Sequence, residues 1–398
     1  MIRARKLLTG LGCVLACQAF LPAWAVSAPA PAAKTKPYVQ WSAIEEPATN
    51  QLHQPLVVKD KVVLGTDNGE LRAYRISDGK LDWKYESGHR IFDQPSSDGE
   101  RIFFAHDGSL IAVTADTGVK VWDFALAGSS SGPTYASHEK RLVYTADCNG
   151  KLYALDAKTG AKRWDSDFLA DAPPDPPGFD GGRARIDGTK ARPSALASDG
   201  DGVFLSVFDQ CRVIAFDATT GKRRWAFQTR GWSYGPAVVT ATSVLVGSQD
   251  RRLYCLDKKT GEQVWKFASN GLVQSAGSID KRFVYFASLN GRLYCLNLAD
   301  GKLQWRMDVD PAPSDGRRRI NSEPFLHDGV LHFTAGGGWV YAIDAADGTP
   351  RWKLQPYEKS ESYCRPVTDG KSYFVVTEHG RDQVPPAGVT SLLRISVK

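Results

Sequence analysis

The stretch LYALDAKTGAKRW at residues 152–164 decides the fold of this chain, because six other segments align with it without a gap. In each segment a small residue lies six positions before a Gly and ten positions before a Trp. The six segments are residues 71–83, 110–122, 213–225, 253–265, 293–305 and 340–352. Such self-similarity, at a spacing of about 40 residues, is the signature of a repeat architecture.

Each copy has the local chemistry of antiparallel strands joined by tight turns. Residues 152–155 alternate with period two, which predicts a strand, and Thr159-Gly160 then supplies a turn in which Gly takes the positive φ. The Trp lies on the next strand, and another strand, residues 141–147 in this copy, precedes the motif. A fourth strand comes before that one and usually starts at a Pro, which is tolerated at the first position of a strand. These starts are Pro55, Pro95, Pro133, Pro193, Pro236, Pro324 and Pro366, with Ala276 in the remaining copy.

Four-stranded units of about 40 residues predict an all-β fold, a β-propeller of antiparallel blades. Seven complete motifs accompany eight first strands, and the last copy stops after residues 391–397 without its Gly or Trp. Residues 38–41 (YVQW) resemble residues 302–305 (KLQW), so we expect the N-terminal strand to complete an eighth blade and close the ring. The Trp residues expected to dock between blades are Trp41, Trp83, Trp122, Trp164, Trp225, Trp265, Trp305 and Trp352.

The composition fits this single ring, although a length of 398 residues would otherwise favour two or three domains. With 42% hydrophobic and 24% charged residues, the chain is not disordered, collagen-like or a polytopic membrane protein. The net charge of +6 is mild and does not indicate a nucleic-acid partner. We expect residues 37–398 to form one domain and the protein to be a monomer.

The N-terminus has the pattern of an export signal. A basic segment precedes an apolar run that ends in an A-x-A pattern at Ala25, so residues 1–25 are predicted to be a signal peptide cleaved after Ala25. The sequence VLAC, ending at Cys17, also resembles a lipobox, which leaves lipidation at Cys17 as the less favoured alternative. Residues 26–36 then form a Pro/Ala-rich tether. The mature chain is expected in the periplasm or outside the cell, without a transmembrane span.

The motif A-x-D-x-x-T-G-x-x-x-W resembles the tryptophan-docking repeat of the PQQ-repeat β-propeller superfamily. It is matched in full by Ala154, Asp156, Thr159, Gly160 and Trp164. The resemblance implies one of two branches. One comprises quinoprotein dehydrogenases, which hold pyrroloquinoline quinone (PQQ) and Ca²⁺ at the propeller axis. The other comprises non-enzymatic propellers, including BamB-like proteins of outer-membrane protein assembly, and a shared fold does not by itself choose between them.

Departures from the enzyme branch favour the non-enzymatic one. The sequence contains no Cys-Cys dipeptide and no C-x-x-C-H haem motif, and no complete catalytic constellation stands out. We therefore expect an exported scaffold that binds a protein or peptide in the cell envelope, with no catalytic residue, metal or cofactor. The alternative is a compact PQQ-dependent oxidoreductase that holds PQQ and Ca²⁺ at its axis.

The residues just before each first strand are the candidates for a site, because first strands line the axis of a propeller. They are polar and mixed in charge, which suits either a water-filled channel or a ligand site. Arg192 and Arg365 are the best candidates for clamping a carboxylate or phosphate, and Trp232 for stacking on a ligand. The candidate ligand-binding residues are His53, Gln54, Asp93, Gln94, Arg192, Trp232, Tyr234, Gln274, Glu323 and Arg365.

Two insertions are expected to overhang the same mouth, residues 165–190 and 308–320. The first is rich in Asp, but interleaved Pro residues separate the carboxylates that Ca²⁺ would need together, so no metal site is predicted. The second carries three successive Arg residues, which suit a solvated loop or an acidic partner surface. Cys148 and Cys211 fall in equivalent turns of adjacent blades, and export leaves a disulfide between them open.

Overall fold

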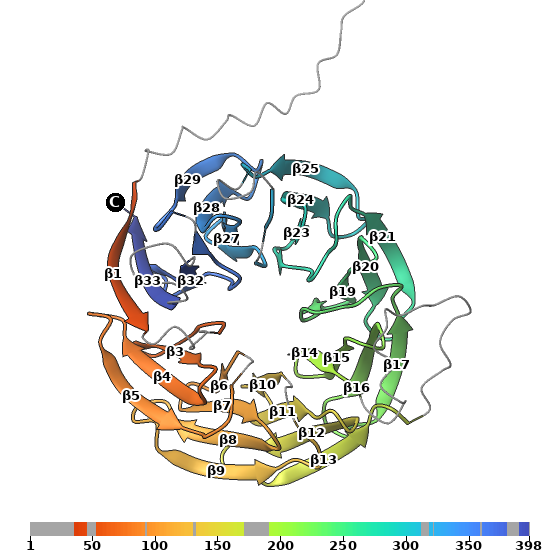
Figure 1. Ribbon diagram of the computed structural model, residues 1–398. Helices are drawn as coiled ribbons and strands as arrows, with labels where there is room; N and C mark the ends of the chain where they lie inside the picture. Colours follow the sequence, from red (N-terminus) through yellow and green to blue (C-terminus); the bar gives the residue numbers. More distant parts are fainter. Residues whose placement is uncertain are drawn as a thin grey trace, which may run out of the picture. The chain divides into compact units, whose positions relative to one another are not determined.

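The computed structural model describes residues 36–45, 53–91, 94–129, 133–170, 191–311, 318–320, 322–358, 360–379 and 390–397. Within residues 34–398, eight antiparallel sheets stand around a central axis like the blades of a propeller (Figure 1). The predicted all-β, eight-bladed fold is therefore confirmed. The described part of the chain holds no helix with the length and hydropathy that a membrane crossing requires.

Each blade runs from a short strand at the axis to an edge strand at the rim, in chain order in blades 1 to 7, whereas the rim strand of the eighth blade is β1 (Pro37–Glu45). The first strands are β2 (Leu56–Val58), β6 (Ser96–Ser97), β10 (Thr134–Ser137), β14 (Pro193–Ser198), β18 (Val238–Val239), β22 (Ser278–Ile279), β26 (Phe325–His327) and β31 (Val367–Thr368). The second strands are β3 (Lys61–Gly65), β7 (Arg101–His106), β11 (Leu142–Ala146), β15 (Gly202–Val207), β19 (Ser243–Ser248), β23 (Phe283–Ser288), β27 (Val330–Ala335) and β32 (Tyr373–His379). We number the blades 1 to 8 in this order.

The third strands carry the small residue of the motif, and the fourth strands carry the Trp. The third strands are β4 (Glu70–Arg75), β8 (Ser109–Thr114), β12 (Lys151–Asp156), β16 (Arg212–Asp217), β20 (Arg252–Asp257), β24 (Arg292–Asn297), β28 (Trp339–Asp344) and β33 (Thr390–Val397). The fourth strands are β5 (Leu81–Glu86), β9 (Lys120–Ala125), β13 (Lys162–Asp167), β17 (Arg223–Gln228), β21 (Gln263–Ala268), β25 (Leu303–Asp308), β29 (Pro350–Leu354) and β1 (Pro37–Glu45).

Blade 8 is assembled from both ends of the chain, as the sequence predicts. Strand β1 pairs antiparallel with β33, and Figure 1 shows the two strands side by side. Trp41 is the register partner of Arg394, next to a β-bulge that begins at Val39. A fifth, unpredicted strand, β30 (Ser360–Glu361), pairs with the end of β32. Closing the ring pairs the open side of β33, which would otherwise leave an unpaired edge.

The docking Trp residues fasten each blade to the next one. In seven of them the indole Nε1 donates to a backbone carbonyl at the end of the third strand of the following blade, over 2.9–3.2 Å. The ring of each indole also covers the turn glycine of that blade: the Cδ2 atom of Trp122 would lie 2.7 Å from a Cβ at Gly160. The Gly is therefore required twice, for its φ of +72° and for the close approach of the indole.

Trp352 departs from this pattern. No such hydrogen bond from Trp352 occurs within the described residues. Trp352 is still buried, and it packs in a cluster with Val375 and Ile395 of blade 8. It contributes to docking by apolar contact alone.

A ring on the second strand of the blade packs against the docking Trp in most blades, and this repeated position was not predicted from the sequence. Six of the docking Trp residues have a second-strand ring of the same blade with its centroid 5.7–6.0 Å away. In five blades this ring is Phe or Tyr, and in blade 7 it is His332.

The five described cysteines are free, so the structure contains no bond between Cys148 and Cys211.

Candidate functional site at the propeller axis

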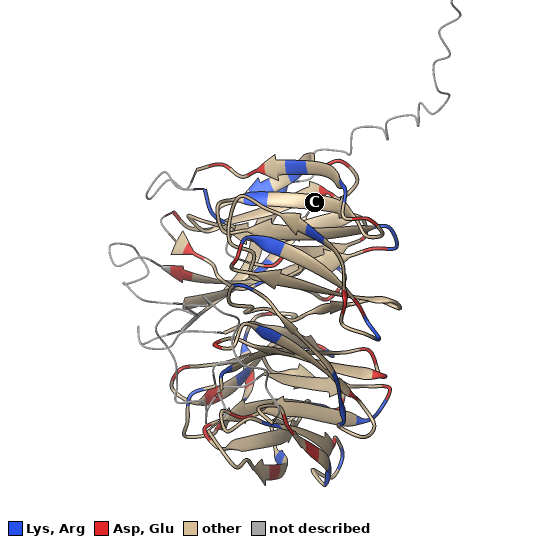
Figure 2. Ribbon diagram, turned by 90° about the vertical axis from the view of Figure 1, so that its right-hand side faces the viewer, with Lys and Arg blue, Asp and Glu red and all other residues tan. Residues whose placement is uncertain are grey.

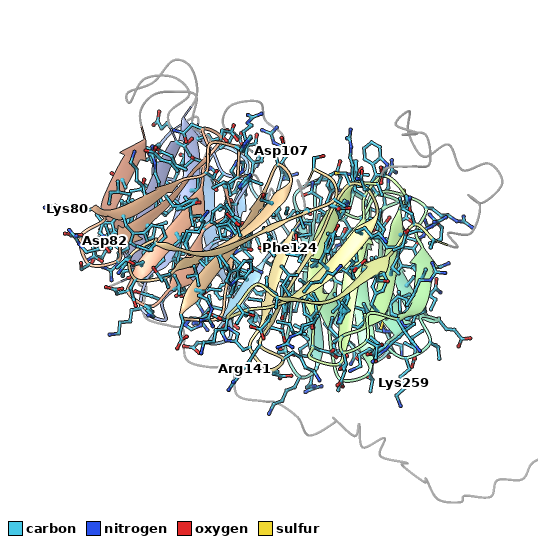
Figure 3. The ribbon with its side chains drawn as sticks, turned by 90° about the horizontal axis from the view of Figure 1, so that it is seen from below. Lys80, Asp82, Asp107, Phe124, Arg141 and Lys259 are labelled. Carbon is cyan, nitrogen blue, oxygen red and sulfur yellow. The ribbon has the colours of Figure 1, made fainter. Side chains whose placement is uncertain are left out.

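The ring has two chemically different faces, which Figure 3 shows edge-on. Asp107, in the turn between β7 and β8, lies at one face, whereas Arg141 and Lys259 lie at the opposite face. The first face also carries the segments that lead into the first strands, and we call its central opening the mouth. On the side of the ring seen in Figure 2, acidic and basic residues are interspersed, as expected for a surface without a strong field of one sign.

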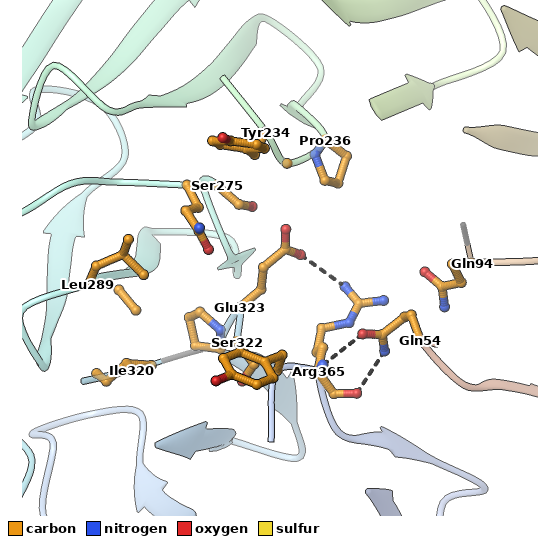
Figure 4. Close-up of a pocket in the computed structure, with 15 residues that line it drawn as sticks. Gln54, Gln94, Tyr234, Pro236, Ser275, Leu289, Ile320, Ser322, Glu323 and Arg365 are labelled. Carbon is orange, nitrogen blue, oxygen red and sulfur yellow. Dashed lines mark hydrogen bonds and ion pairs between the residues drawn. The ribbon is translucent and has the colours of Figure 1, made fainter. Parts of the chain in front are cut away.

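The mouth leads into a pocket of about 250 Å³, which we call the axial pocket (Figure 4). It is lined by Gln54, Gln94, Tyr234, Gly235, Pro236, Gln274, Ser275, Ala287, Leu289, Ile320, Ser322, Glu323, Pro324, Tyr363 and Arg365. Six of the ten residues proposed from the sequence are therefore brought together: Gln54, Gln94, Tyr234, Gln274, Glu323 and Arg365. Blades 1, 2, 5, 6, 7 and 8 all contribute to it.

Three of the remaining proposed residues lie elsewhere. His53 is hydrogen bonded through Nε2 to Asp67 at 3.0 Å, and burial is the main cause that lowers the pKa of its imidazole. The backbone N–H of Arg192 donates to Asp209, and the Arg192 side chain does not line the axial pocket. Trp232 packs on Phe208 with ring centroids 4.6 Å apart. Asp93 lies outside the described residues.

Two of the polar residues in the axial pocket hold the ring together. The side-chain amide of Gln54 donates to the carbonyl of Arg365 and accepts from its backbone N–H, both over 2.7 Å, which joins blade 1 to blade 8. The amide of Gln94 donates to the carbonyl of Pro55 at 3.0 Å and joins blade 2 to blade 1. Both side chains therefore hydrogen bond one blade to its neighbour, which was not predicted from the sequence.

Similar bonds join the other blades near the axis. Blade 4 meets blade 5 where the hydroxyl of Ser194 donates to the carbonyl of Ser233 over 2.8 Å. Blade 6 meets blade 7 where Ser278 donates to the carbonyl of Pro324 over 2.7 Å. Blade 7 meets blade 8 where Thr334 donates to the carbonyl of Cys364 over 3.3 Å. These contacts hold the walls of the axial pocket in fixed positions.

The charged groups of the axial pocket are Glu323 and Arg365. Glu323 Oε2 and Arg365 Nη1 are 3.7 Å apart, and their side chains are 23% and 31% exposed. The guanidinium of Arg365 also lies over the ring of Phe325, 5.9 Å from its centroid. Within the described residues, neither head group makes a hydrogen bond to protein, so both retain their hydrogen-bonding capacity.

Sequence reasoning missed several pocket residues. Tyr363 is 59% exposed at the mouth, and Leu289 and Ile320 form an apolar wall. Tyr363 comes three residues before Pro366, so a wider window around each first strand would have included it. Leu289 lies between the second and third strands of blade 6 and gives no local signal of a site.

A second cavity of about 640 Å³ lies further along the axis, among the first strands of blades 2 to 5. It is lined largely by small residues, including Ser96, Thr134 and Ala197. Gln94, Pro236, Glu323 and Arg365 line both cavities. The Glu323–Arg365 pair therefore stands at the boundary between the axial pocket and the rest of the channel.

The donor atoms at the axis do not fit a Ca²⁺ ion with a quinone. Ca²⁺ takes about six to eight oxygen ligands, usually with several carboxylates. The described lining of the axial pocket offers one carboxylate, Glu323, with the cationic Arg365 beside it. Within the described residues, no group of three or more His, Cys, Asp or Glu side chains could hold a metal.

The predicted insertions are described only in part. In the first, Asp165 and Asp167 belong to β13 and face Lys151, while residues 171–190 lie outside the described residues. In the second, residues 312–317 lie outside them. Arg319 is described, and it pairs with Glu361 at 3.0 Å, within this chain.

A closed ring of four-stranded blades fastened by docking Trp residues defines the class of PQQ-repeat β-propellers. A family model described as "Outer membrane protein assembly factor BamB" matches residues 38–174, 106–202 and 209–384. The chain therefore belongs to the family of outer membrane protein assembly factor BamB.

Individual relatives are more distant. The outer membrane protein assembly factor BamB of Alkalilimnicola ehrlichii is 29% identical over 130 residues, which are 29% of this chain and 32% of the relative. That of Shewanella oneidensis is 25% identical over 115 residues, 27% of this chain and 28% of the relative. The matched stretches thus span about a third of each relative.

Solved structures share the fold across both branches of the superfamily. The crystal structure of BamB from Moraxella catarrhalis aligns with a TM-score of 0.66 and 19% identity, covering 90% of this chain and all of that chain. A europium-containing methanol dehydrogenase aligns with a TM-score of 0.64 and 14% identity, covering 90% and 93%. Structural likeness at these identities establishes the fold alone.

Proposed function

We propose that this chain is an exported, non-enzymatic propeller that acts as a protein-binding scaffold in the assembly of outer-membrane proteins. The observation that carries the proposal is the family match, which extends over most of the ring. The relatives named above are assembly factors. A ring braced by Trp docking at its rim and by hydrogen bonds at its axis suits a scaffold, because a preorganised surface loses little entropy on binding.

The chemistry of the axis also favours a scaffold over a quinoprotein oxidoreductase. Among the described residues that line the axial pocket, the one carboxylate is paired with Arg365, and a guanidinium opposes a divalent cation. The mouth and its surrounding loops remain available to a protein partner.

Two parallel measurements on the full chain test the proposal. Tagged protein is purified from the organism that encodes it, after mild cross-linking, and probed for the known outer-membrane assembly proteins of that organism. Purified protein is titrated with PQQ in the presence of Ca²⁺, while absorbance and dye-linked alcohol oxidation are followed. We expect stoichiometric recovery of assembly proteins, whereas PQQ uptake with turnover would overturn the proposal.

A further inference from the structure

We propose that the axial pocket binds a small zwitterion, namely a free α-amino acid, whose carboxylate pairs with Arg365 and whose ammonium pairs with Glu323. This inference does not depend on a role in outer-membrane assembly. It rests on the geometry of one ion pair and on the walls around it.

Among the described arginine–carboxylate pairs, the Glu323–Arg365 pair differs in that neither head group makes a hydrogen bond. Arg252–Asp250 and Arg394–Asp369 are also long, at 3.8 and 3.9 Å, but there each guanidinium donates to another acceptor. A tight guanidinium–carboxylate pair brings nitrogen and oxygen to about 2.7–2.9 Å, usually in two parallel hydrogen bonds. Arg101 reaches such distances with Asp98, because its Nε and Nη2 both donate to Oδ2, over 3.0 and 2.6 Å. Glu323 and Arg365 approach to only 3.7 Å, so the pair has charge attraction without a hydrogen bond.

The backbone of each residue is nevertheless fixed. Gln54 makes two hydrogen bonds of 2.7 Å to the main chain of Arg365. Pro324 follows Glu323, and its carbonyl accepts from Ser278 over 2.7 Å. The two charges are thus held near each other, in a preorganised arrangement, with their hydrogen-bonding atoms directed into the axial pocket (Figure 4).

A zwitterion satisfies both groups at once. Its carboxylate can accept two hydrogen bonds from the guanidinium, and its ammonium can donate to the carboxylate of Glu323, so one loose contact is replaced by two charge-assisted ones. A ligand with a single charge is expected to bind more weakly. An anion meets repulsion from Glu323, and a cation meets repulsion from Arg365, so the pair selects against both.

The walls accommodate one side chain of the ligand. Leu289 and Ile320 supply apolar surface, while Tyr234 and Tyr363 contribute aromatic rings to the lining and are 36% and 59% exposed. Buried or half-buried aromatic surface gives contact area at little conformational cost. The axial pocket, at about 250 Å³, has room for one amino acid on the mouth side of the Glu323–Arg365 pair.

Ligand-observed NMR on the full mature chain tests the proposal with matched probes. L-Leucine and L-phenylalanine are the zwitterions. 3-Methylbutylamine and 4-methylpentanoate carry only the amine or only the carboxylate, and glucose is the uncharged polar control. We expect saturable binding of at least one of the two amino acids, with each single-charge analogue at least tenfold weaker. Equal binding of either analogue, glucose binding alone, or no binding of either amino acid below 10 mM would overturn the proposal.

Variants then assign the two charges. Arg365→Gln and Glu323→Gln are each expected to weaken amino-acid binding at least tenfold, because each leaves one charge of the ligand unpaired. Arg101→Gln, in the ion pair with Asp98, is the matched control and should leave binding unchanged. Thermal unfolding of each variant verifies that the ring is intact. Unchanged binding in folded Arg365→Gln and Glu323→Gln variants would contradict the assignment.

Discussion

Trp41 and Arg394 face each other across β1 and β33, and both donate to the same acceptor, the carbonyl of Ile76 in blade 1. The two hydrogen bonds measure 2.9 Å from the Trp41 indole and 2.8 Å from the Arg394 guanidinium. In blade 1 the residue opposite the docking Trp is Ala73, which donates no side-chain hydrogen bond. The blade built from both chain ends is thus fastened to its neighbour twice.

This arrangement predicts that the N-terminal strand is required for a stable ring. Trp41→Ala removes the bond to Ile76 and the contact with Phe374, and it should lower the free energy of unfolding by about 3–5 kcal/mol. Deletion of residues 26–45 should lower the melting temperature sharply. Circular dichroism during thermal and urea unfolding measures both effects. Trp232→Ala, outside the docking positions, is the control, and an unchanged melting curve for the deletion would contradict closure by β1.

A second prediction separates the two requirements for Gly in the repeated turn. Gly160 and Gly108 both have positive φ, +72° and +81°. Only Gly160 is covered by an indole, that of Trp122, whereas a Cβ at Gly108 would meet no atom within 4 Å. Gly160→Ala should therefore destabilise the ring by at least 1 kcal/mol more than Gly108→Ala, because overpacking adds to the backbone strain. If urea unfolding shows that the two variants lose the same free energy of unfolding, the close approach of the indole adds nothing to the cost of the substitution at Gly160.

A third prediction concerns the buried imidazole of His332. Neither of its ring nitrogens has a hydrogen-bond partner, and burial lowers the pKa of His332 to about 3, with His327 and Arg351 as lesser causes. Between pH 6.5 and about 3, His332 is therefore protonated in the unfolded chain but neutral in the folded ring. Stability is fully present above pH 6.5 and falls as the pH is lowered, by about 2 kcal/mol at pH 5.

The repeat suggests the variant that removes this sensitivity. The equivalent position holds Phe in other blades, such as Phe103 beneath Trp122 and Phe374 beneath Trp41. His332→Phe should therefore be tolerated at pH 8 and should raise the melting temperature relative to the wild type at pH 5. The comparison is made by thermal unfolding at both pH values. A variant whose advantage over the wild type is the same at pH 5 and pH 8 would exclude His332 as the titrating group.

A fourth prediction follows from the inner bonds of the ring. Gln54→Ala leaves the backbone N–H and carbonyl of Arg365 without their side-chain partner. We expect a loss of about 1–3 kcal/mol in the free energy of unfolding. Gln304→Ala provides the matched control, because Gln304 is exposed on β25 and its amide bonds only to the nearby carbonyl of Lys302. If both variants unfold at the same urea concentration, the closure at the axis is not stabilising.

The features that could be predicted from the sequence are local and repeated. The spacing from Ala154 to Gly160 and Trp164 fixes two strands and a turn within 11 residues, and its repetition gives seven of the eight blades. The axial pocket was only partly predictable. Its residues come from six blades, and which of them reach the axis depends on how the loops fold back. Gln54 and Arg365 are 311 residues apart, so their mutual hydrogen bonds leave no pattern along the chain.

The most direct test of a role in outer-membrane assembly is the amount of correctly folded outer-membrane β-barrel protein in cells that lack this chain. Folded and unfolded barrels are separated by their heat-dependent mobility in gels, in a deletion strain with and without the gene restored. We predict that deletion lowers the folded fraction and that the full chain restores it, whereas the chain without residues 26–45 does not. An unchanged folded fraction in the deletion strain would contradict the account.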